Sequence, residues 1–242
     1  MSIASVSQLV ISAEIAMRNS NFLDAVQDFS EAVKIKSDDA YLIQQYALAT
    51  YKNKLPTLLA ALHKAREIIQ PLNPQHSTDA ETLAIAGSIH KKLWLITWNA
   101  DDLAQAEGYY KRGFEQDNNY YCGENYALCL NLRASSQRDI NLQMRLNMQA
   151  HQIREALIKI LYAITEDANF VNRTDKKWVL ATLANTFFAL GRTEEGLFYE
   201  GFLFMEKYEV FSQWERDTYE FEKLQLMKLL NSKHLKADRQ LQ

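Results

Sequence analysis

Residues suited to close helix packing recur along the chain at intervals of four and then three positions. The pattern occurs at Ala25, Phe29 and Ala32; at Ala61, Ala65 and Ile68; at Ala106, Tyr110 and Gly113; and at Gly196, Glu200 and Leu203. Positions three and four apart lie on one face of a helix. Small residues there let a partner helix approach closely, and a ring fills the space between neighbouring pairs. The pattern therefore predicts packed helical hairpins.

Apolar spacing and polar breaks outline the individual helices. A first helix is predicted over about residues 4–18, with Leu9, Ala13 and Ala16 on one face and a break at Asn19. Leu180, Leu183, Ala184, Phe187 and Gly191 supply a later helix and its turn. A long helix is expected over about 138–166, a loop over 167–177, and a final helix over 213–231.

The repeated hairpins decide the expected fold class. One hairpin cannot bury its apolar face alone, so such units stack on their neighbours. The 242 residues contain only 7 glycines and 3 prolines, and they lack the alternating β-branched runs typical of strands. We therefore predict an all-α protein, an α-α superhelix built as a tetratricopeptide-like solenoid of hairpins, whose usual period is about 34 residues.

Charge and composition narrow the setting and the partners. The 27 basic and 30 acidic residues leave a formal net charge of -3, which offers no global attraction for nucleic acid or an anionic membrane. No apolar segment approaches the roughly 20 residues that span a bilayer, and the start lacks the features of a secretory signal, so a cytoplasmic location is expected. Cys122 and Cys129 are interpreted as small buried hydrophobes.

A denser motif occupies residues 86–136. It contains Gly87, then Ala-x-x-x-Tyr-x-x-Gly-Phe-Glu from Ala106, and then Tyr-x-Gly-x-Asn-Tyr-Ala from Tyr121. This motif resembles the TRAFs-binding domain in the central regulatory region of the apoptosis signal-regulating kinases and its bacterial relatives, and the likeness covers about residues 78–230. The resemblance implies a regulatory helical-repeat module that serves as a platform for partners, and no kinase segment is present.

The domain organisation follows from the repeats and from this resemblance. Residues 1–76 are predicted to form N-terminal tetratricopeptide-like hairpins. Residues 77–232 are predicted to form TRAFs-binding-like repeats that continue from the first part. Residues 233–242 are predicted to be a frayed tail, as chain termini often are.

No catalytic or metal-binding motif is found. The chain has no phosphate-binding glycine loop, no His-Glu-x-x-His and no Cys-x-x-Cys. The five histidines are dispersed along the chain. His90 lies where the repeat pattern favours a ring, so a packing role is enough to explain it. Asp101-Asp102 and Glu194-Glu195 are interpreted as helix starts, where acidic groups face the positive end of the helix dipole. We expect no enzyme activity, no cofactor and no metal.

Candidate binding residues come from the repeat register, which projects the first helix of each hairpin onto the concave face. The projected partner-binding residues are Glu14, Arg18, Thr50, Asn53, Lys54, Ser88, Lys91, Lys92, Asn125, Arg133 and Asn185. The list is polar and mainly basic, which suits an acidic segment or a free C-terminus, although a solvated helix face would look similar. Trp94 and Trp98 either cap the turn that follows them or form an exposed anchor for a partner.

The leading hypothesis is a protein-protein interaction module, a scaffold or regulatory adaptor without chemistry of its own. A regulatory subunit that senses a nucleotide or another small anion is the alternative, together with a cryptic hydrolase or effector. Binding of single-stranded nucleic acid is disfavoured, because aromatic platforms are not interleaved with the basic residues. The partner's identity and a homo-oligomer are left open.

Overall fold

The regular structure is helical. The computed structural model describes residues 5–205 and 211–240, with side chains as far as residue 230. Within these residues there are eleven α-helices, two short 3-10 helices and no strand, so the predicted all-α fold of stacked helical hairpins is confirmed. The chain divides into two compact units, Met1–Asp117 and Asn118–Gln242. No helix in the described part is both long enough and apolar enough to span a bilayer.

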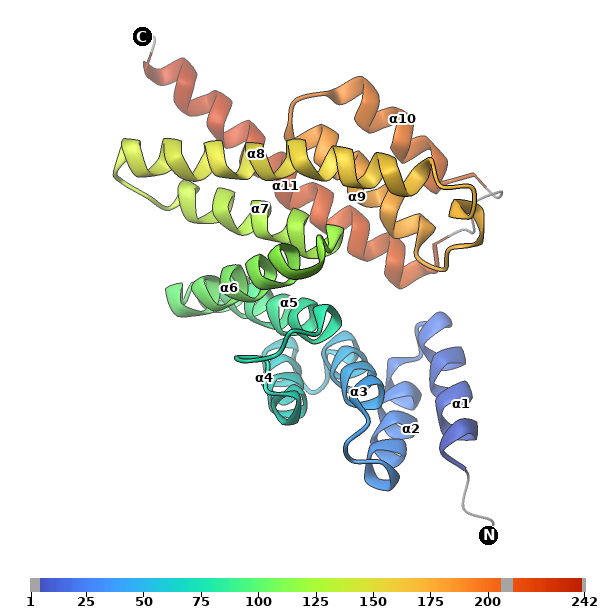
Figure 1. Cartoon of the computed structure of the whole chain (residues 1–242). Coiled ribbons are helices and arrows are strands. Elements are labelled where there is room, and N and C mark those ends of the chain that lie inside the picture. Colours follow the sequence, from blue (N-terminus) through green and yellow to red (C-terminus); the bar gives the residue numbers. More distant parts are fainter. Residues whose placement is uncertain (1–4, 206–210, 241–242) are drawn as a thin grey trace. The chain divides into compact units, whose positions relative to one another are not determined.

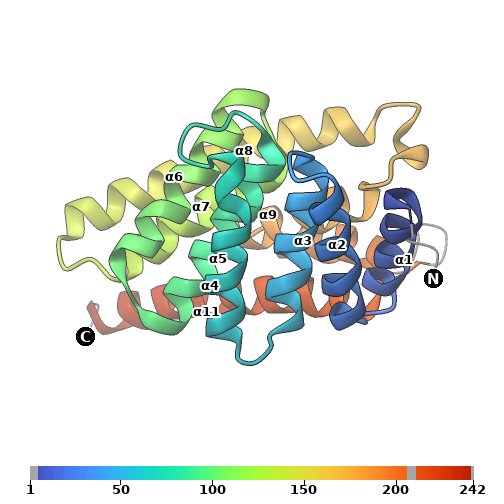
Figure 2. The same ribbon diagram turned by 90° about the horizontal axis from the view of Figure 1, so that it is seen from below.

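Unit 1 consists of three consecutive hairpins. Its helices are α1 (Val6–Arg18), α2 (Phe22–Ile35), α3 (Ala40–Asn53), α4 (Leu58–Ile69), the 3-10 helix η1 (Gln70–Leu72), α5 (Ala80–Thr97) and α6 (Ala100–Asp117). The pairs α1/α2, α3/α4 and α5/α6 pack together. The first helix of each later hairpin also packs on the second helix of the one before it, α3 on α2 and α5 on α4 (Figure 2).

Side-chain caps set where several of these helices begin. Ser5 accepts a hydrogen bond from the backbone N–H of Gln8, whose side chain bonds back to the Ser5 backbone and completes a capping box. Asp39, Thr57 and Asp79 likewise accept a backbone N–H three residues further on. These caps satisfy backbone donors that the first turn leaves without partners. The helix that was predicted over residues 4–18 is thus observed as Val6–Arg18.

The small and large residues of the pattern line the core of unit 1. Ala25, Phe29 and Ala32 are fully buried, with Ala13 and Leu42 in the same cluster. The second set behaves in the same way: Ala61 and Ala65 are fully buried, while Ile68 is partly buried. The predicted packing role of these positions is confirmed.

The third set shows how close the helices come. Tyr110 of α6 is fully buried, and its ring lies so near Gly87 of α5 that a Cβ added there would stand 2.8 Å from the ring. The Tyr110 hydroxyl is 3.0 Å from Ser88 Oγ, so the ring is held by a hydrogen bond as well as by packing. Only glycine leaves room for this contact.

Unit 2 contains two hairpins and a long last helix. Its elements are α7 (Tyr120–Ser135), α8 (Ile140–Thr165), the 3-10 helix η2 (Phe170–Asn172), α9 (Lys176–Ala189), α10 (Thr193–Leu203) and α11 (Gln213–Gln240). α7 pairs with α8, and α9 pairs with α10, while α11 crosses α9 and reaches α7 (Figure 1). Gly191 adopts the left-handed conformation that ends α9.

One predicted helix end differs clearly from the structure. α8 occupies Ile140–Thr165, close to the predicted 138–166, but α11 continues to Gln240 past the end expected near residue 231. The last two residues of the predicted tail, 241–242, lie outside the described residues. The division predicted at residue 76 rested on a family resemblance rather than on compactness, and it stays a prediction.

A buried polar group ties three helices of unit 2 together. Arg154 of α8 donates from Nε and Nη2 to the Glu124 carboxylate of α7, at 2.9–3.1 Å. Its Nη1 donates to Asn131 Oδ1 at 2.7 Å, and Thr186 of α9 donates to Glu124 Oε2 at 3.2 Å. A buried charge is tolerated when it is paired and hydrogen-bonded. All three nitrogens of the buried Arg154 guanidinium have such partners.

We expect opposite effects from the same substitution at two glycines of one hairpin. Gly87→Ala should lower the free energy of unfolding by about 1–3 kcal/mol, because the new methyl group collides with the Tyr110 ring. Gly108→Ala on α6 meets nothing within 4 Å, and it should raise stability by about 0.5–1 kcal/mol through helix propensity. Urea unfolding followed by circular dichroism measures both. Equal effects at the two sites would contradict the close helix contact.

Candidate partner-binding surface

Two lysines lie over one tyrosine ring near the C-terminal end of α3, and a third lysine ends that helix. Lys52 Nζ lies 5.9 Å from the Tyr51 ring centroid, and Lys92 Nζ of α5 lies 6.0 Å from the same centroid. Lys54 is the C-cap of α3, has a left-handed backbone and is exposed. Cations are favoured over aromatic faces and at helix C-termini. We call Lys52, Lys54 and Lys92 the α3–α5 basic face.

Two neighbouring residues that the repeat register projected onto the surface are instead buried. Lys91 is 3% exposed, with Nζ 5.9 Å from the Tyr110 ring centroid. Ser88 is also buried and contacts the Tyr110 hydroxyl. Both side chains pack within the α5/α6 hairpin, so a partner that lies on α5 would meet Lys92 before Lys91.

The other projected residues are distributed over both units. In unit 1, Arg18 is exposed, Asn53 is partly buried, Thr50 is buried, and Glu14 accepts a hydrogen bond from the Tyr41 hydroxyl. In unit 2, Arg133 is partly buried, while Asn125 and Asn185 are buried. Asn125 Nδ2 donates to the Tyr121 carbonyl at 2.9 Å. Binding of a partner by any of these residues stays a prediction.

Unit 2 contains a small hollow between α7, α9 and α11. Its lining residues are Tyr121, Glu124, Asn125, Trp178, Ala181, Thr182, Asn185, Tyr219 and Glu222. Asn185 Oδ1 is buried and has no hydrogen-bond partner among the described residues. A buried acceptor without a partner is costly, so Asn185 Oδ1 is a polar atom that the packing of unit 2 leaves unsatisfied among the described residues.

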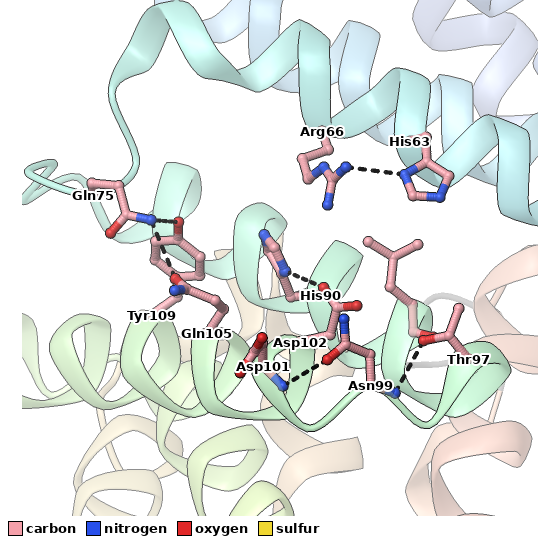
Figure 3. Close-up of polar contacts among 11 residues, drawn as sticks. His63, Arg66, Gln75, His90, Thr97, Asn99, Asp101, Asp102, Gln105 and Tyr109 are labelled. Atoms are coloured by element: carbon pink, nitrogen blue, oxygen red, sulfur yellow. Dashed lines mark hydrogen bonds and ion pairs between the residues drawn. The ribbon is translucent and has the colours of Figure 1, made fainter.

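A half-buried histidine-aspartate pair joins the two helices of the α5/α6 hairpin (Figure 3). His90 Nδ1 lies 2.8 Å from Asp102 Oδ1, and the His90 ring packs 5.6 Å from the Tyr109 ring between centroids. Burial lowers the pKa of His90. The hydrogen bond to Asp102 opposes this lowering of the pKa, whereas the positive charge of Arg66 lowers the pKa further. At neutral pH the histidine is therefore uncharged and packs as a ring, as the sequence predicted.

Nearby contacts pin the loop before α5 to α6. Gln75 Nε2 donates to the Tyr109 hydroxyl at 2.8 Å and to Gln105 Oε1 at 3.2 Å (Figure 3). Arg112 donates to the carbonyl oxygens of Pro74 and Gln75. In these contacts the side chains of Gln75 and Arg112 are bonded to other groups of the same hairpin and loop, which indicates a structural role.

The acidic pairs lie where the sequence placed them. Asp101 and Asp102 are in the first turn of α6, where Asn99 Oδ1 accepts from the Asp101 backbone N–H, and Glu194 and Glu195 are in the first turn of α10. Among the described residues, no three His, Cys, Asp or Glu side chains are grouped as a metal site requires. Cys122 and Cys129 are buried thiols, as predicted.

The two tryptophans at the end of α5 differ in exposure. Trp94 is buried, whereas Trp98 is 71% exposed in a left-handed conformation that ends the helix. Their rings meet edge to face, with centroids 5.1 Å apart. Trp94 therefore belongs to the packing, and the predicted role of a surface anchor is left to Trp98.

The pKa of His90 predicts a pH-dependent stability. Because the folded pKa lies below the unfolded value of about 6.5, the contribution of neutral His90 is present above pH 6.5 and is lost as the pH falls through the folded pKa. The urea concentration at the midpoint of unfolding should therefore decrease as the pH is lowered from 7 to 5. The His90→Gln substitution should make this decrease smaller. His76→Gln, at an exposed histidine, is the control. Identical pH profiles for His90→Gln and the wild type would contradict the prediction.

Comparison with known proteins supports the repeat class. Residues 21–130, somewhat under half of the chain, match the family described as Tetratricopeptide Repeats-Sensor. A comparison with curated proteins found no match. A solved structure described as the crystal structure of MamA protein is 12% identical, with a TM-score of 0.48, over 81% of this chain and 88% of that chain. The resemblance to the TRAFs-binding domain stays a prediction, and residues 21–130 are similar to tetratricopeptide repeats.

Proposed function

We propose that this protein is an interaction module, a scaffold or regulatory adaptor that binds a partner protein through its helical surface and performs no chemistry of its own. The fold of stacked hairpins and the match to a tetratricopeptide family support a role in protein binding. The observation that carries the proposal furthest is the α3–α5 basic face, where two helices bring lysines over one tyrosine ring.

The chemistry of this face favours an acidic partner segment or a free C-terminus. The net charge of the whole chain is -3, so attraction must come from a local group of like charges rather than from the overall field. Carboxylates bind ammonium groups through short charge-assisted hydrogen bonds. The Tyr51 ring restricts Lys52 and Lys92 before binding, which reduces the side-chain entropy lost on association.

Second helices of the same unit provide a matched control. Lys34 on α2 pairs with Glu31, and Lys64 on α4 pairs with Glu67, in both cases within one turn of helix. These lysines are exposed. Reversing their charge changes the net charge of the protein by the same amount as reversing two charges of the basic face.

We expect Lys54→Glu combined with Lys92→Glu to weaken binding of an acidic partner at least tenfold, since like charges would then face each other. Lys34→Glu combined with Lys64→Glu should leave the affinity within about twofold. Partners captured from the native host by the wild type are identified by mass spectrometry, and their Kd values are then measured for all three proteins. Affinity should also fall with added salt, because exposed charges are screened. Equal loss in both double variants would reject the basic face.

The sensing alternative is separated by a ligand test. The name of the matched family contains the word sensor, and a small ligand specific for the native state raises the melting temperature by mass action. If the protein is an interaction module, nucleotides at millimolar concentration should leave its melting temperature unchanged. A concentration-dependent rise would favour the small-anion sensor, and turnover of the nucleotide would favour the hydrolase.

A further inference from the structure

The second helix of the last hairpin leaves one whole side uncovered. α10 packs on α9, and Figure 1 shows it at the edge of unit 2. Its inner side carries Gly196 and Leu203, which are buried. Its outer side carries Leu197, Phe198 and Met205, which are 55%, 60% and 49% exposed. Single exposed apolar residues are common on protein surfaces, but a contiguous group of them marks an interaction site.

The exposed residues follow the spacing of a helix that packs on another helix. They are three, one, three, three and one residues apart, and such positions share one side of an α-helix. All of them are exposed. We call this set the α10 outer stripe, and it consists of Glu194, Leu197, Phe198, Gly201, Phe204 and Met205.

The glycine in the middle of the stripe is unfavourable for a single chain. Gly201 is helical and exposed, and a Cβ added to it would meet nothing within 4 Å. The C-cap of α10 is Phe204, so Gly201 is not the residue that ends the helix. Glycine within a helix is less stable than alanine, because it loses more conformational freedom on folding. The packing of one chain alone therefore gives no reason for Gly201.

Two other helical glycines of this chain receive a ring from the facing helix. Tyr110 lies against Gly87, and Phe188 lies against Gly196. In both contacts the missing side chain lets the two helices approach closely. An exposed glycine with a ring beside it on the same face has the two halves of such a contact.

The outer stripe carries both halves, and they do not meet within one chain. The exposed Phe198 ring is held edge to face by Phe202, with centroids 4.9 Å apart. It does not cover Gly201, whose Cβ position has nothing within 4 Å. A second α10 that runs antiparallel across a two-fold axis places the Phe198 ring of each copy on Gly201 of the other. A surface of this kind is complementary to itself, as a two-fold interface requires.

The charges at the two ends of the stripe agree with this arrangement. Glu194 is exposed in the first turn of α10. At the other end, Arg216 of α11 lies over the Phe204 ring, 4.9 Å from its centroid. A two-fold axis midway between Phe198 and Gly201 sets Glu194 of one copy opposite the residue that follows Phe204 in the other copy. Each end of the pair then brings a carboxylate to a guanidinium.

We propose that two copies of this chain associate through the α10 outer stripe, as an antiparallel helix pair with its two-fold axis between Phe198 and Gly201. This association does not use the α3–α5 basic face, so it goes beyond the proposed binding of a partner protein. The pair consists of two short helices, and small interfaces are weak. The expected state is a monomer that dimerises with a Kd in the micromolar range.

Sedimentation equilibrium of the full-length chain, over concentrations that span the micromolar range, tests the proposal. Gly201→Leu should weaken the dimer about tenfold or more, because the new side chain fills the space that the ring of the other copy needs. This loss is expected although the substitution adds apolar surface. Gly108→Leu is the matched control, since Gly108 is also exposed with nothing within 4 Å of its Cβ position, and its Kd should stay within about twofold of the wild type.

A second variant removes the ring without adding bulk. Phe198→Ala should weaken the dimer to a similar degree as Gly201→Leu. Phe198 is 60% exposed in the single chain, so the fold tolerates its truncation. Circular dichroism and thermal unfolding check that each variant remains folded.

A charge exchange tests the antiparallel direction. Glu194→Arg alone and Arg216→Glu alone should each weaken self-association about threefold, because like charges then meet at both ends of the pair. An equimolar mixture of these two variants should recover the wild-type affinity, because opposite charges face each other at both ends of the mixed dimer.

Four results would overturn the inference. A wild-type chain that stays monomeric would mean that a second copy does not occupy the stripe. Undiminished association of Gly201→Leu would mean that no ring packs on this glycine. Growth beyond a dimer would indicate an open-ended contact rather than a closed pair. A mixture of the charge variants that does not recover affinity would reject the antiparallel direction. None of these results bears on the α3–α5 basic face, so the two proposals fail independently.

Discussion

The close approach of paired helices, made possible by small residues where they meet, is the constraint on which the remaining structure depends. At Gly87 the Tyr110 ring takes the space that a Cβ would need, and at Gly196 the Phe188 ring does the same, 2.6 Å from where a Cβ would stand. Dense packing of this kind gives a hairpin a defined geometry. Each hairpin then presents a rigid face to the next, and every proposed surface lies on helices held in this way.

Polar groups occupy the places that this packing leaves to them. Ser88 bonds the hydroxyl of the ring that closes the α5/α6 contact, and His90, two residues further along α5, bonds Asp102 of α6. The lysines with a proposed binding role lie at the end of α3 and at a partly exposed position of α5. Stability and recognition are thereby carried by different side chains, which lets a charge change at Lys92 alter binding without opening the core.

Helix positions and their packing could be predicted from the sequence because they depend on local spacing. Ala25, Phe29 and Ala32 share a face in any α-helix, and their burial follows once the helix has a partner. Projection onto the concave face was less accurate, because it assumes that one side of each first helix stays uncovered. α5 is buried without a break from Thr82 to Ile89, as α3, α4 and α6 cover it, and this explains why Ser88 is buried.

Contacts between distant segments could not be predicted from spacing alone. His90 and Asp102 meet because the α5–α6 turn brings them together, and either residue alone has an ordinary explanation. Arg154 stands among the buried positions of α8, between Ala150 and Leu157, a signal that pointed to a buried partner without naming Glu124. The path of α11 over α9 and α7 leaves no mark on its own sequence, because an amphipathic stripe suits the next position of a stack equally well.

The link from Glu124 to Arg154 and Thr186 also bears on how such a chain can evolve. Repeat proteins commonly lengthen or shorten by duplicating or deleting whole hairpins, which is tolerated when neighbouring hairpins share only apolar contacts. Here one carboxylate serves an arginine in its own hairpin and a threonine in the following one. Deleting the α7/α8 hairpin would remove the carboxylate and the arginine together, but it would leave Thr186 without its acceptor. Deleting α8 alone would leave a part-buried negative charge without its partner. The helices α7, α8 and α9 are therefore expected to be inherited together.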